Sequence, residues 1–230
     1  MILLTIMAFL PPLIYVIWIR NTEKINKEKW LPITICFAWG ATIAIIAAVI
    51  IEIVLELSLI PPGTNPGLAY IIPIVIIAPF AEELTKPLAL KLKTVRKELD
   101  EIEDGLIYGA VAGLGFSATE NLLYGYSFLA EGFFVFLMLM IIRSFGGCLL
   151  HASATAWTGF GYGKVIMKHQ TILKVIPYFL LAFIIHAVYN SLLVFDILGV
   201  TIGLLAALFF TLVTITLVRN KIKKLDQLPS

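Results

Sequence analysis

Ionisable side chains interrupt several apolar stretches of this chain, at positions where a lipid-facing sequence would carry none. Glu82, Glu83 and Lys86 lie within IIAPFAEELTKPLAL, residues 76–90. A charged side chain at the centre of a bilayer costs on the order of 3 kcal/mol on insertion scales, so such groups usually face the protein interior and indicate a functional site. Glu82 and Lys86 are four residues apart, which places them on one face of a helix where they can form an ion pair.

Three later stretches carry an acid, a cation, two histidines and two amides. These residues are Glu120 and Asn121, then Arg143 and His151, and finally His186 and Asn190. Peptide hydrolysis requires a base that activates water and donors that stabilise the tetrahedral oxyanion. Two carboxyl groups in unlike environments can divide the base and acid roles. We therefore expect these side chains to meet at one hydrated point, with Glu82 as the base and Glu120 as the second carboxyl group.

Long apolar stretches must position these groups. The chain has 230 residues, of which 60% are hydrophobic and 14% charged, and its mean hydropathy is +0.98. A transmembrane helix needs about 20 apolar residues, and a helix satisfies its own backbone hydrogen bonds in lipid. The sequence predicts an all-α polytopic membrane helical bundle of about seven transmembrane helices. We expect one integral membrane domain over 1–230, with a catalytic core at about 68–195. The expected spans are 1–19, 32–58, 68–90, 105–129, 133–163, 175–195 and 200–218.

Lysine and arginine occur in alternate loops. They are present at 20–31, 91–104, 164–174 and the C-terminal tail, whereas the loops 59–67, 130–132 and 196–199 carry none. Because these residues accumulate in cytoplasmic loops, the pattern predicts a multi-pass protein of the cell membrane with its N-terminus outside and its C-terminus in the cytoplasm. The alternation requires the long, glycine-rich stretch 133–163 to cross only once.

Small residues and cysteines add two further expectations. Gly105, Gly109 and Gly113 have the spacing that lets two membrane helices pack closely. Cys36 and Cys148 lie in apolar segments without metal-ligand spacing, and we interpret them as buried thiols.

The four polar stretches resemble, in order, the four motifs of the PrsW-type intramembrane glutamic endopeptidases, which are distant relatives of the CAAX prenyl endopeptidases and the bacteriocin-processing group. The matching segments are EELTK (82–86), FSATEN (116–121), the segment from Arg143 to His151, and HAVYN (186–190). The resemblance implies a membrane-embedded endopeptidase that acts on membrane-associated protein or peptide substrates, with an anti-sigma factor-like protein as one example. The implied surroundings are the lipid bilayer, and no nucleic acid is expected as a partner.

The resemblance also implies roles for individual residues. Glu82 would activate a water molecule as the general base, and Glu120 would help to hold that water. His186 and Asn190 would form the oxyanion-stabilising pair. The other motif residues would be co-catalytic or supporting: Glu83, His151, Lys86, Asn121 and Arg143. Glu120 stands where the CAAX branch has a histidine, so the prenyl-cysteine substrate of that branch is not expected here.

Other functions are compatible with the same side chains. A zinc-dependent peptidase would use ligands drawn from Glu82, Glu120, His151 and His186, although the sequence has no H-E-x-x-H motif and the leading interpretation needs no cofactor. A proton-coupled membrane transporter would use the same buried acids and histidines, although no inverted repeat is visible. A third possibility is a module that binds hydrophobic segments without cutting them.

Each motif also has a purely structural interpretation. Glu82, Glu83 and Lys86 could be a structural ion pair, Glu120 and Asn121 a polar clamp between helices, Arg143 a counter-ion, and each histidine a satisfied core residue. An active site would instead require water. We expect a cavity that opens to one membrane face and is lined by Glu82, Glu120 and His186, with Phe116 and Tyr124 nearby. Glu52 and Glu56, near the outer end of the second span, would be solvated or line an outer vestibule.

Overall fold

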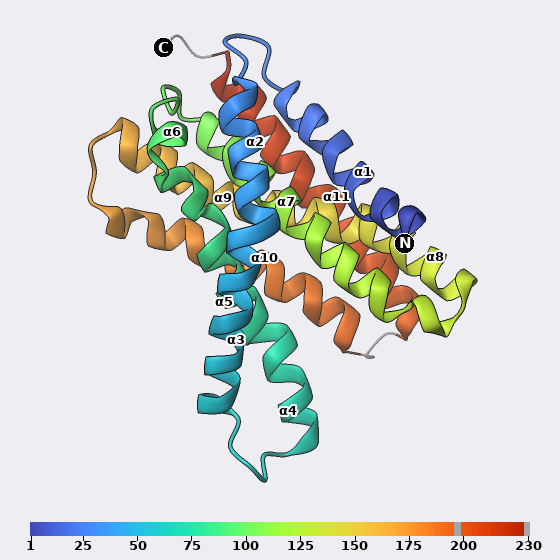
Figure 1. The fold of residues 1–230 in the computed structure, drawn as a ribbon. Coiled ribbons are helices and arrows are strands. Elements are labelled where there is room, and N and C mark those ends of the chain that lie inside the picture. The colour runs from blue at the N-terminus through green and yellow to red at the C-terminus, as the bar shows by residue number, and fades with distance from the viewer. Residues whose placement is uncertain (196–198, 228–230) are drawn as a thin grey trace.

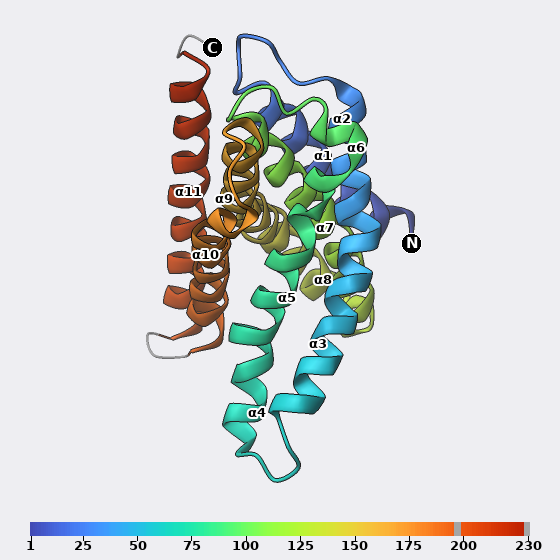
Figure 2. The ribbon, with the colours of Figure 1, turned by 90° about the vertical axis from the view of Figure 1, so that its left-hand side faces the viewer.

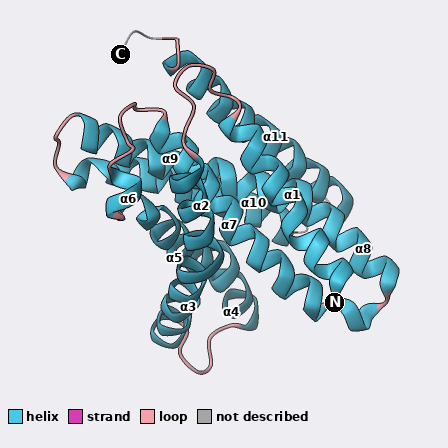
Figure 3. Ribbon diagram, turned by 45° about the horizontal axis from the view of Figure 1, so that its top comes forward, coloured by secondary structure: helices cyan, strands magenta, loops and turns pink. Residues whose placement is uncertain are grey.

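The computed structural model describes residues 1–195 and 199–227, and these residues form helices joined by loops, with no strand among them (Figure 3). This confirms the predicted all-α bundle. The α-helices are α1 (Ile2–Arg20), α2 (Trp30–Trp39), α3 (Ile45–Leu59), α4 (Pro66–Ile72), α5 (Ala78–Thr85), α6 (Lys93–Arg96), α7 (Asp104–Ser127), α8 (Phe133–Ile142), α9 (Cys148–Met167), α10 (Ile176–Val194) and α11 (Val200–Leu225). Short π-turns are η1 (Gly40–Ala44), η2 (Pro73–Ile77) and η5 (Arg143–Gly147), and 3₁₀-turns are η3 (Lys86–Lys91), η4 (Leu129–Glu131) and η6 (Ile172–Val175).

Several elements continue into one another and form longer rods (Figure 1). Within the described residues, six rods are long and apolar enough to cross a membrane: Ile2–Arg20, Trp30–Leu59, Pro66–Lys91, Phe133–Met167, Ile172–Val194 and Val200–Leu225. Residues 133–167 form one rod of 35 residues, as the alternation of charged loops requires. The protein is therefore a multi-pass membrane protein, and each of these rods begins and ends within a few residues of an expected span except α11, which continues past residue 218.

The remaining expected span, 105–129, corresponds to α7, which differs from the others in its surroundings. Its 24 residues extend about 36 Å at 1.5 Å per residue, enough to cross the hydrocarbon core. Most of its residues are buried among the other helices, so this helix needs little lipid-facing apolar surface. We expected about seven similar spans, and the structure gives six apolar rods around a central helix of small residues.

Small residues in α7 allow its neighbours to approach its backbone. Gly105, Gly109 and Gly113 all face α9, so the predicted close helix packing is present. A Cβ atom on Gly109 would lie only 2.6 Å from the Thr155 carbonyl oxygen of α9. On another side of α7, Gly115 lies against α2. The backbones of α7 and α9 therefore pack in direct contact, which fixes the distance between the polar groups that they carry.

The loops separate into two ends of the bundle. At one end the hairpin of α3 and α4 extends beyond the other helices (Figure 2). At the opposite end, the loop between α1 and α2, the loop before α7 and the end of α11 lie together (Figure 2). The Asp226 carboxylate accepts hydrogen bonds from the backbone N–H groups of Lys24 and Ile25, which ties α11 to the first of these loops. The expected loop 91–104 contains the single turn α6, and the expected loop 196–199 falls almost entirely outside the described residues.

Candidate active site

Lys86 lies at the centre of the polar residues that the sequence singles out. Its Nζ atom lies 2.7 Å from Glu82 Oε2 and 2.8 Å from Glu83 Oε1, and all three residues come from the rod that contains α5. His151 of α9 brings its Nδ1 atom to 2.8 Å from the same ammonium group. The Phe116 ring of α7 covers this ammonium at 4.4 Å. The predicted ion pair between Glu82 and Lys86 is therefore present, and it extends across the bundle to α9.

Glu83 is fully buried and joins three helices. Its Oε1 atom accepts hydrogen bonds from Lys86 and from His186 Nδ1 of α10, the latter at 3.0 Å. Its Oε2 atom accepts from the Thr155 hydroxyl of α9 at 2.8 Å. Because an ionised carboxylate only accepts, His186 Nδ1 must carry a proton here. Glu83 is thus held in the core by three donors and serves to position the groups around it.

His151 connects this cluster to Glu120 of α7. A lysine ammonium only donates, so His151 Nδ1 must accept from Lys86, and Nε2–H then donates to Glu120 Oε2 at 2.7 Å. Arg143 Nη2, at the start of η5, lies 2.8 Å from the same carboxylate oxygen. Its Nε–H donates to the Asn121 side-chain oxygen at 2.8 Å. The Glu82 and Glu120 carboxylates are therefore linked through Lys86 and His151.

Asn190 lies one helical turn beyond His186 on α10 and contacts the backbone of a neighbouring rod. Its amide donates to the Ile74 carbonyl oxygen at 2.8 Å. Ile74 lies in the π-turn η2, and Pro79, which has no N–H, follows it, so regular helical hydrogen bonding is interrupted there. This contact fixes the amide and uses one of its two N–H groups. The oxyanion role of His186 and Asn190 stays a prediction.

A cavity of about 500 Å³ lies beside this cluster and is open to the outside of the bundle. The polar residues that line it come from the motif segments and from the helices around them. They are Glu82, Glu120, His151, His186, Asn190, Arg143, Tyr124, Tyr189, Glu52 and Glu56. The cavity therefore has the expected lining at Glu82, Glu120 and His186, and Tyr124 is nearby as expected. Phe116 is not among the lining residues, because its ring packs against Lys86.

The cavity extends toward the end of the bundle at which α3 ends and α4 begins. Glu52 and Glu56 of α3, Tyr70 of α4 and Tyr124 of α7 line this part of it. The expectation that the two α3 glutamates border a vestibule agrees with this arrangement.

Sequence reasoning did not single out Thr155, which contacts the buried Glu83 carboxylate, because a lone threonine in an apolar helix carries no recognisable signal.

Three donors in the cluster have the composition of a catalytic zinc site. One donor atom from each of Glu82, His151 and His186 lies within 4.8 Å of the other two, and two imidazoles with one carboxylate form a known catalytic ligand set. However, Lys86 Nζ lies 2.7 Å from Glu82 Oε2 and 2.8 Å from His151 Nδ1. A zinc ion between these atoms would meet direct repulsion from the ammonium. In this arrangement the residues do not fit a metal ion, because Lys86 already contacts two of the three donors.

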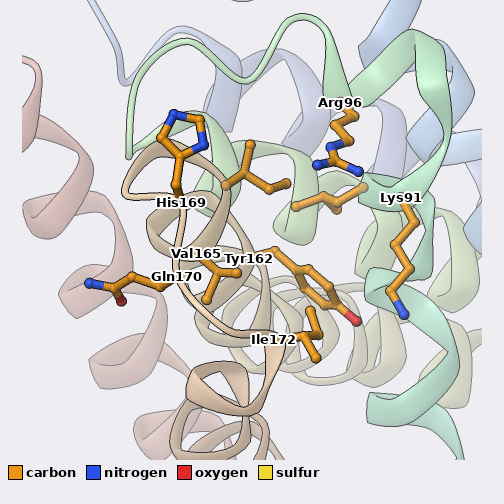
Figure 4. A pocket seen from close by; sticks show the side chains of 9 residues that line it. Lys91, Arg96, Tyr162, Val165, His169, Gln170 and Ile172 are labelled. Carbon is orange, nitrogen blue, oxygen red and sulfur yellow. The ribbon is translucent and has the colours of Figure 1, made fainter.

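A second cavity, of about 360 Å³, lies between the segment that follows α5 and the last turns of α9 with the loop after them (Figure 4). Lys91 and Arg96 line one side of it, and Tyr162 and His169 line the other (Figure 4). Its lining in the described part of the chain contains no carboxylate and no residue of the four motif segments. We therefore do not include it in the candidate active site.

Comparison with known proteins gives two kinds of match. A family profile described as "PrsW family intramembrane metalloprotease" matches residues 28–218. A protein named Protease PrsW from Clostridioides difficile (strain 630) is 30% identical over 126 residues, which cover 54% of this chain and 51% of that protein. Another protein of that name, from Geobacillus kaustophilus (strain HTA426), is 36% identical over 99 residues, covering 42% of this chain and 40% of that protein.

The chain thus spans about half the length, or less, of the curated relatives that it matches. No solved structure matches it significantly. The family profile, by contrast, covers most of the chain and includes all four motif segments that meet around Lys86. The chain therefore belongs to the PrsW family.

Proposed function

We propose that this protein is an intramembrane endopeptidase in which Glu82 activates the attacking water. The observation that supports this best is the convergence of the four motif segments on one cavity, with Glu82 and Glu120 both on its wall. A structural ion pair alone would not need two carboxylates joined through a lysine and a histidine. Membership of a family described as proteases favours hydrolysis over proton-coupled transport.

Charge in the cluster suits a glutamate base. Glu82, Glu83 and Glu120 provide three carboxylates, which Lys86 and Arg143 only partly balance. Lys86 Nζ lies 2.7 Å from Glu82 Oε2 and holds that carboxylate in place on the cavity wall. Glu82 then takes a proton from water as the water oxygen attacks the carbonyl carbon of the scissile amide. The same proton passes to the amide nitrogen as the carbon–nitrogen bond breaks, so the reaction needs no other reactant.

The oxyanion that forms during this attack needs donors, and His186 and Asn190 supply them in our proposal. His186 Nδ1 already donates to Glu83 at 3.0 Å, so its Nε2 atom can donate only if the ring carries a second proton. A ring with two protons would bring a third positive charge to the three carboxylates of the cluster, beside Lys86 and Arg143. Asn190 would contribute the amide N–H that Ile74 does not accept. Glu120, fixed by His151 and Arg143, would hold the water.

The position of the cavity suggests where cleavage takes place. It extends toward the end formed by α3 and α4, opposite the loops rich in lysine and arginine. If those loops are cytoplasmic, as their charge predicts, the site opens toward the outer face. The substrate would be a membrane-associated protein that is cut within or near the outer part of the bilayer, and an anti-sigma factor-like protein is one candidate.

The proposal is tested with the purified protein in liposomes together with a panel of single-span membrane proteins, including an anti-sigma factor-like protein, and with mass spectrometry of the products. We expect Glu82→Gln to lower the cleavage rate about 10²- to 10⁴-fold, the range for loss of a general base. Glu120→Gln and His186→Ala should also reduce it strongly. Glu131→Gln, in the exposed turn η4, is the control. Near-normal cleavage by the first three variants would exclude this mechanism, and intact recovery of every bound protein would favour a binding module.

A zinc-dependent peptidase is the second candidate, because the family profile is described as a metalloprotease and three donors lie close together. Its ligands would be Glu82, His151 and His186, and the position of Lys86 between two of them opposes this candidate. Metal analysis of the purified protein separates the two candidates. Stoichiometric zinc, with activity lost on chelation and restored by zinc alone, would favour the metal enzyme over the proposal.

A further inference from the structure

A second group of carboxylates is buried at the loop end of the bundle, away from the candidate active site. Glu23 and Glu28 come from the loop between α1 and α2, Glu101 comes from the segment that leads into α7, and Asp104 is the first residue of α7. Figure 2 shows these two loops side by side, next to the end of α11. Three of these residues are buried, with exposed surface fractions of 0% for Glu23, 6% for Glu28 and 1% for Asp104. We call these four residues the acidic cluster.

The side chains of the acidic cluster point toward one another. One carboxylate oxygen from each of Glu23, Glu101 and Asp104 lies within 4.8 Å of the other two. Glu23 Oε1 and Glu28 Oε1 are buried atoms without a hydrogen-bond partner in the described part of the chain. Buried carboxylate oxygens are normally hydrogen-bonded or paired with a cation, since leaving them unpaired costs free energy. Among the described residues, no hydrogen-bond donor satisfies Glu23 Oε1 or Glu28 Oε1.

Neighbouring donors satisfy only part of the cluster. Glu23 Oε2 accepts from the Glu28 backbone N–H at 3.1 Å, and the Tyr108 hydroxyl donates to Glu28 Oε2. Asp104 Oδ2 accepts from the backbone N–H groups of Asp100 and Glu101. These neutral donors orient the carboxylates without neutralising them.

The lysine and arginine side chains near the acidic cluster contact other groups. Arg20 Nε donates to the backbone carbonyl of Glu28, and Lys29 pairs with Glu98 at 2.6 Å. Lys24 Nζ donates to the Asn21 carbonyl. Within residues 1–195 and 199–227, no lysine or arginine forms an ion pair with the acidic cluster.

We propose that the acidic cluster binds a divalent cation through carboxylate oxygens. Ca²⁺ lies 2.3–2.6 Å from its oxygen ligands, so ligands on opposite sides of it are up to about 5 Å apart. Mg²⁺ lies 2.0–2.1 Å from its ligands, which limits that separation to about 4.2 Å. The three oxygens lie within 4.8 Å of one another, which is compatible with one shared Ca²⁺ ion, and Ca²⁺ tolerates the wider spacing of the two cations.

A cation at this position would join two separate segments of the chain. It would connect the loop between α1 and α2 to the first residue of α7, the central helix that carries Glu120 toward its other end. Because the ligands come together only in the folded protein, binding would stabilise the fold by mass action. The cation is thus assigned a structural role that is independent of the proposed hydrolysis.

Thermal unfolding of the whole protein in a neutral detergent tests this assignment. After EDTA treatment and dialysis, CaCl₂ and MgCl₂ are added separately, with KCl at matched ionic strength as the salt control. We expect Ca²⁺ to raise the melting temperature by several degrees at about a hundredfold excess over its dissociation constant. Binding of radioactive Ca²⁺ should approach one ion per chain. A response to Mg²⁺ as well would identify a general divalent site.

Substitutions locate the response. Glu23→Gln and Asp104→Asn should abolish the Ca²⁺-dependent rise, whereas Glu98→Gln, a neighbouring acid outside the cluster, should keep it. If the buried variants do not fold, Glu101→Gln gives the same test from the less buried side of the cluster. Absence of binding for both cations, or an unchanged rise in Glu101→Gln together with any folded cluster variant, would overturn the proposal. The test measures the melting temperature and Ca²⁺ binding, so its outcome does not depend on peptidase activity.

Discussion

Replacing Gly109 by alanine should separate α7 and α9, the two helices that carry Glu120 and His151. The new Cβ atom would lie 2.6 Å from the Thr155 carbonyl oxygen, whereas ordinary contacts begin at 3.4 Å. The difference, 3.4 − 2.6, requires α7 and α9 to move apart by about 0.8 Å. The backbone fixes the position of the new Cβ atom, and the atom that it meets is a backbone carbonyl oxygen. No side-chain rotation can therefore relieve this contact. Overpacking of this kind costs about 1–3 kcal/mol.

The same movement should disturb catalysis, because α9 carries Thr155 and His151 while α7 carries Glu120. The His151–Glu120 hydrogen bond, 2.7 Å long, joins these two helices. A displacement near 1 Å can reduce a rate by about 10²-fold when it misplaces reacting groups. We therefore expect a lower melting temperature by several degrees together with a marked loss of cleavage, measured by thermal unfolding in detergent and by the liposome assay.

Gly147→Ala is the matched control for stability. Gly147 is also buried and helical, but a Cβ atom there would meet nothing closer than 3.7 Å. Alanine favours the helical backbone more than glycine does, so this variant should melt at the same temperature as the parent or higher. If Gly109→Ala proved as stable as Gly147→Ala, the contact between α7 and α9 would not have the role that we assign to it.

Further substitutions test the supporting contacts. Thr155→Val removes one of the three donors to the buried Glu83 carboxylate and should cost about 1–3 kcal/mol, whereas Thr155→Ser should retain most of the stability in the same unfolding assay. Arg143→Gln removes the cation beside Glu120 and should lower cleavage at least tenfold, and an unchanged rate would show that Arg143 is dispensable. Tyr108→Phe removes the hydroxyl that donates to Glu28 and should lower the melting temperature in EDTA, and an unaltered melting temperature would contradict this contact. Chelators should leave cleavage intact if the glutamate mechanism holds.

Some features of the site followed directly from the residue types and their spacing. Glu82 and Lys86 pair because residues four apart share a helix face. Gly105, Gly109 and Gly113 contact α9 because small residues at this interval let two helices approach. The convergence of the motifs was also predicted, since charged groups avoid lipid and collect inside a bundle.

Other features could not be predicted, because spacing along one helix says nothing about how that helix is rotated against its neighbours. Two adjacent glutamates look equivalent in the sequence. Only the packing places Glu82 on the cavity wall and Glu83 in the core between Thr155 and His186. The contact of Lys86 with His151, which opposes a metal ion, is likewise a contact between separate helices.

The sequence by itself determined that this protein is a helical membrane protein and which helices carry its polar groups, because hydropathy and helical period are local properties of the chain. Only the tertiary structure decided which groups meet. It made α7 the central helix, joined Glu120 to the cluster through His151, and brought Glu23 beside Asp104 at the far end. These contacts depend on helix packing and on loops that are distant in sequence, and packing is set by the whole bundle together.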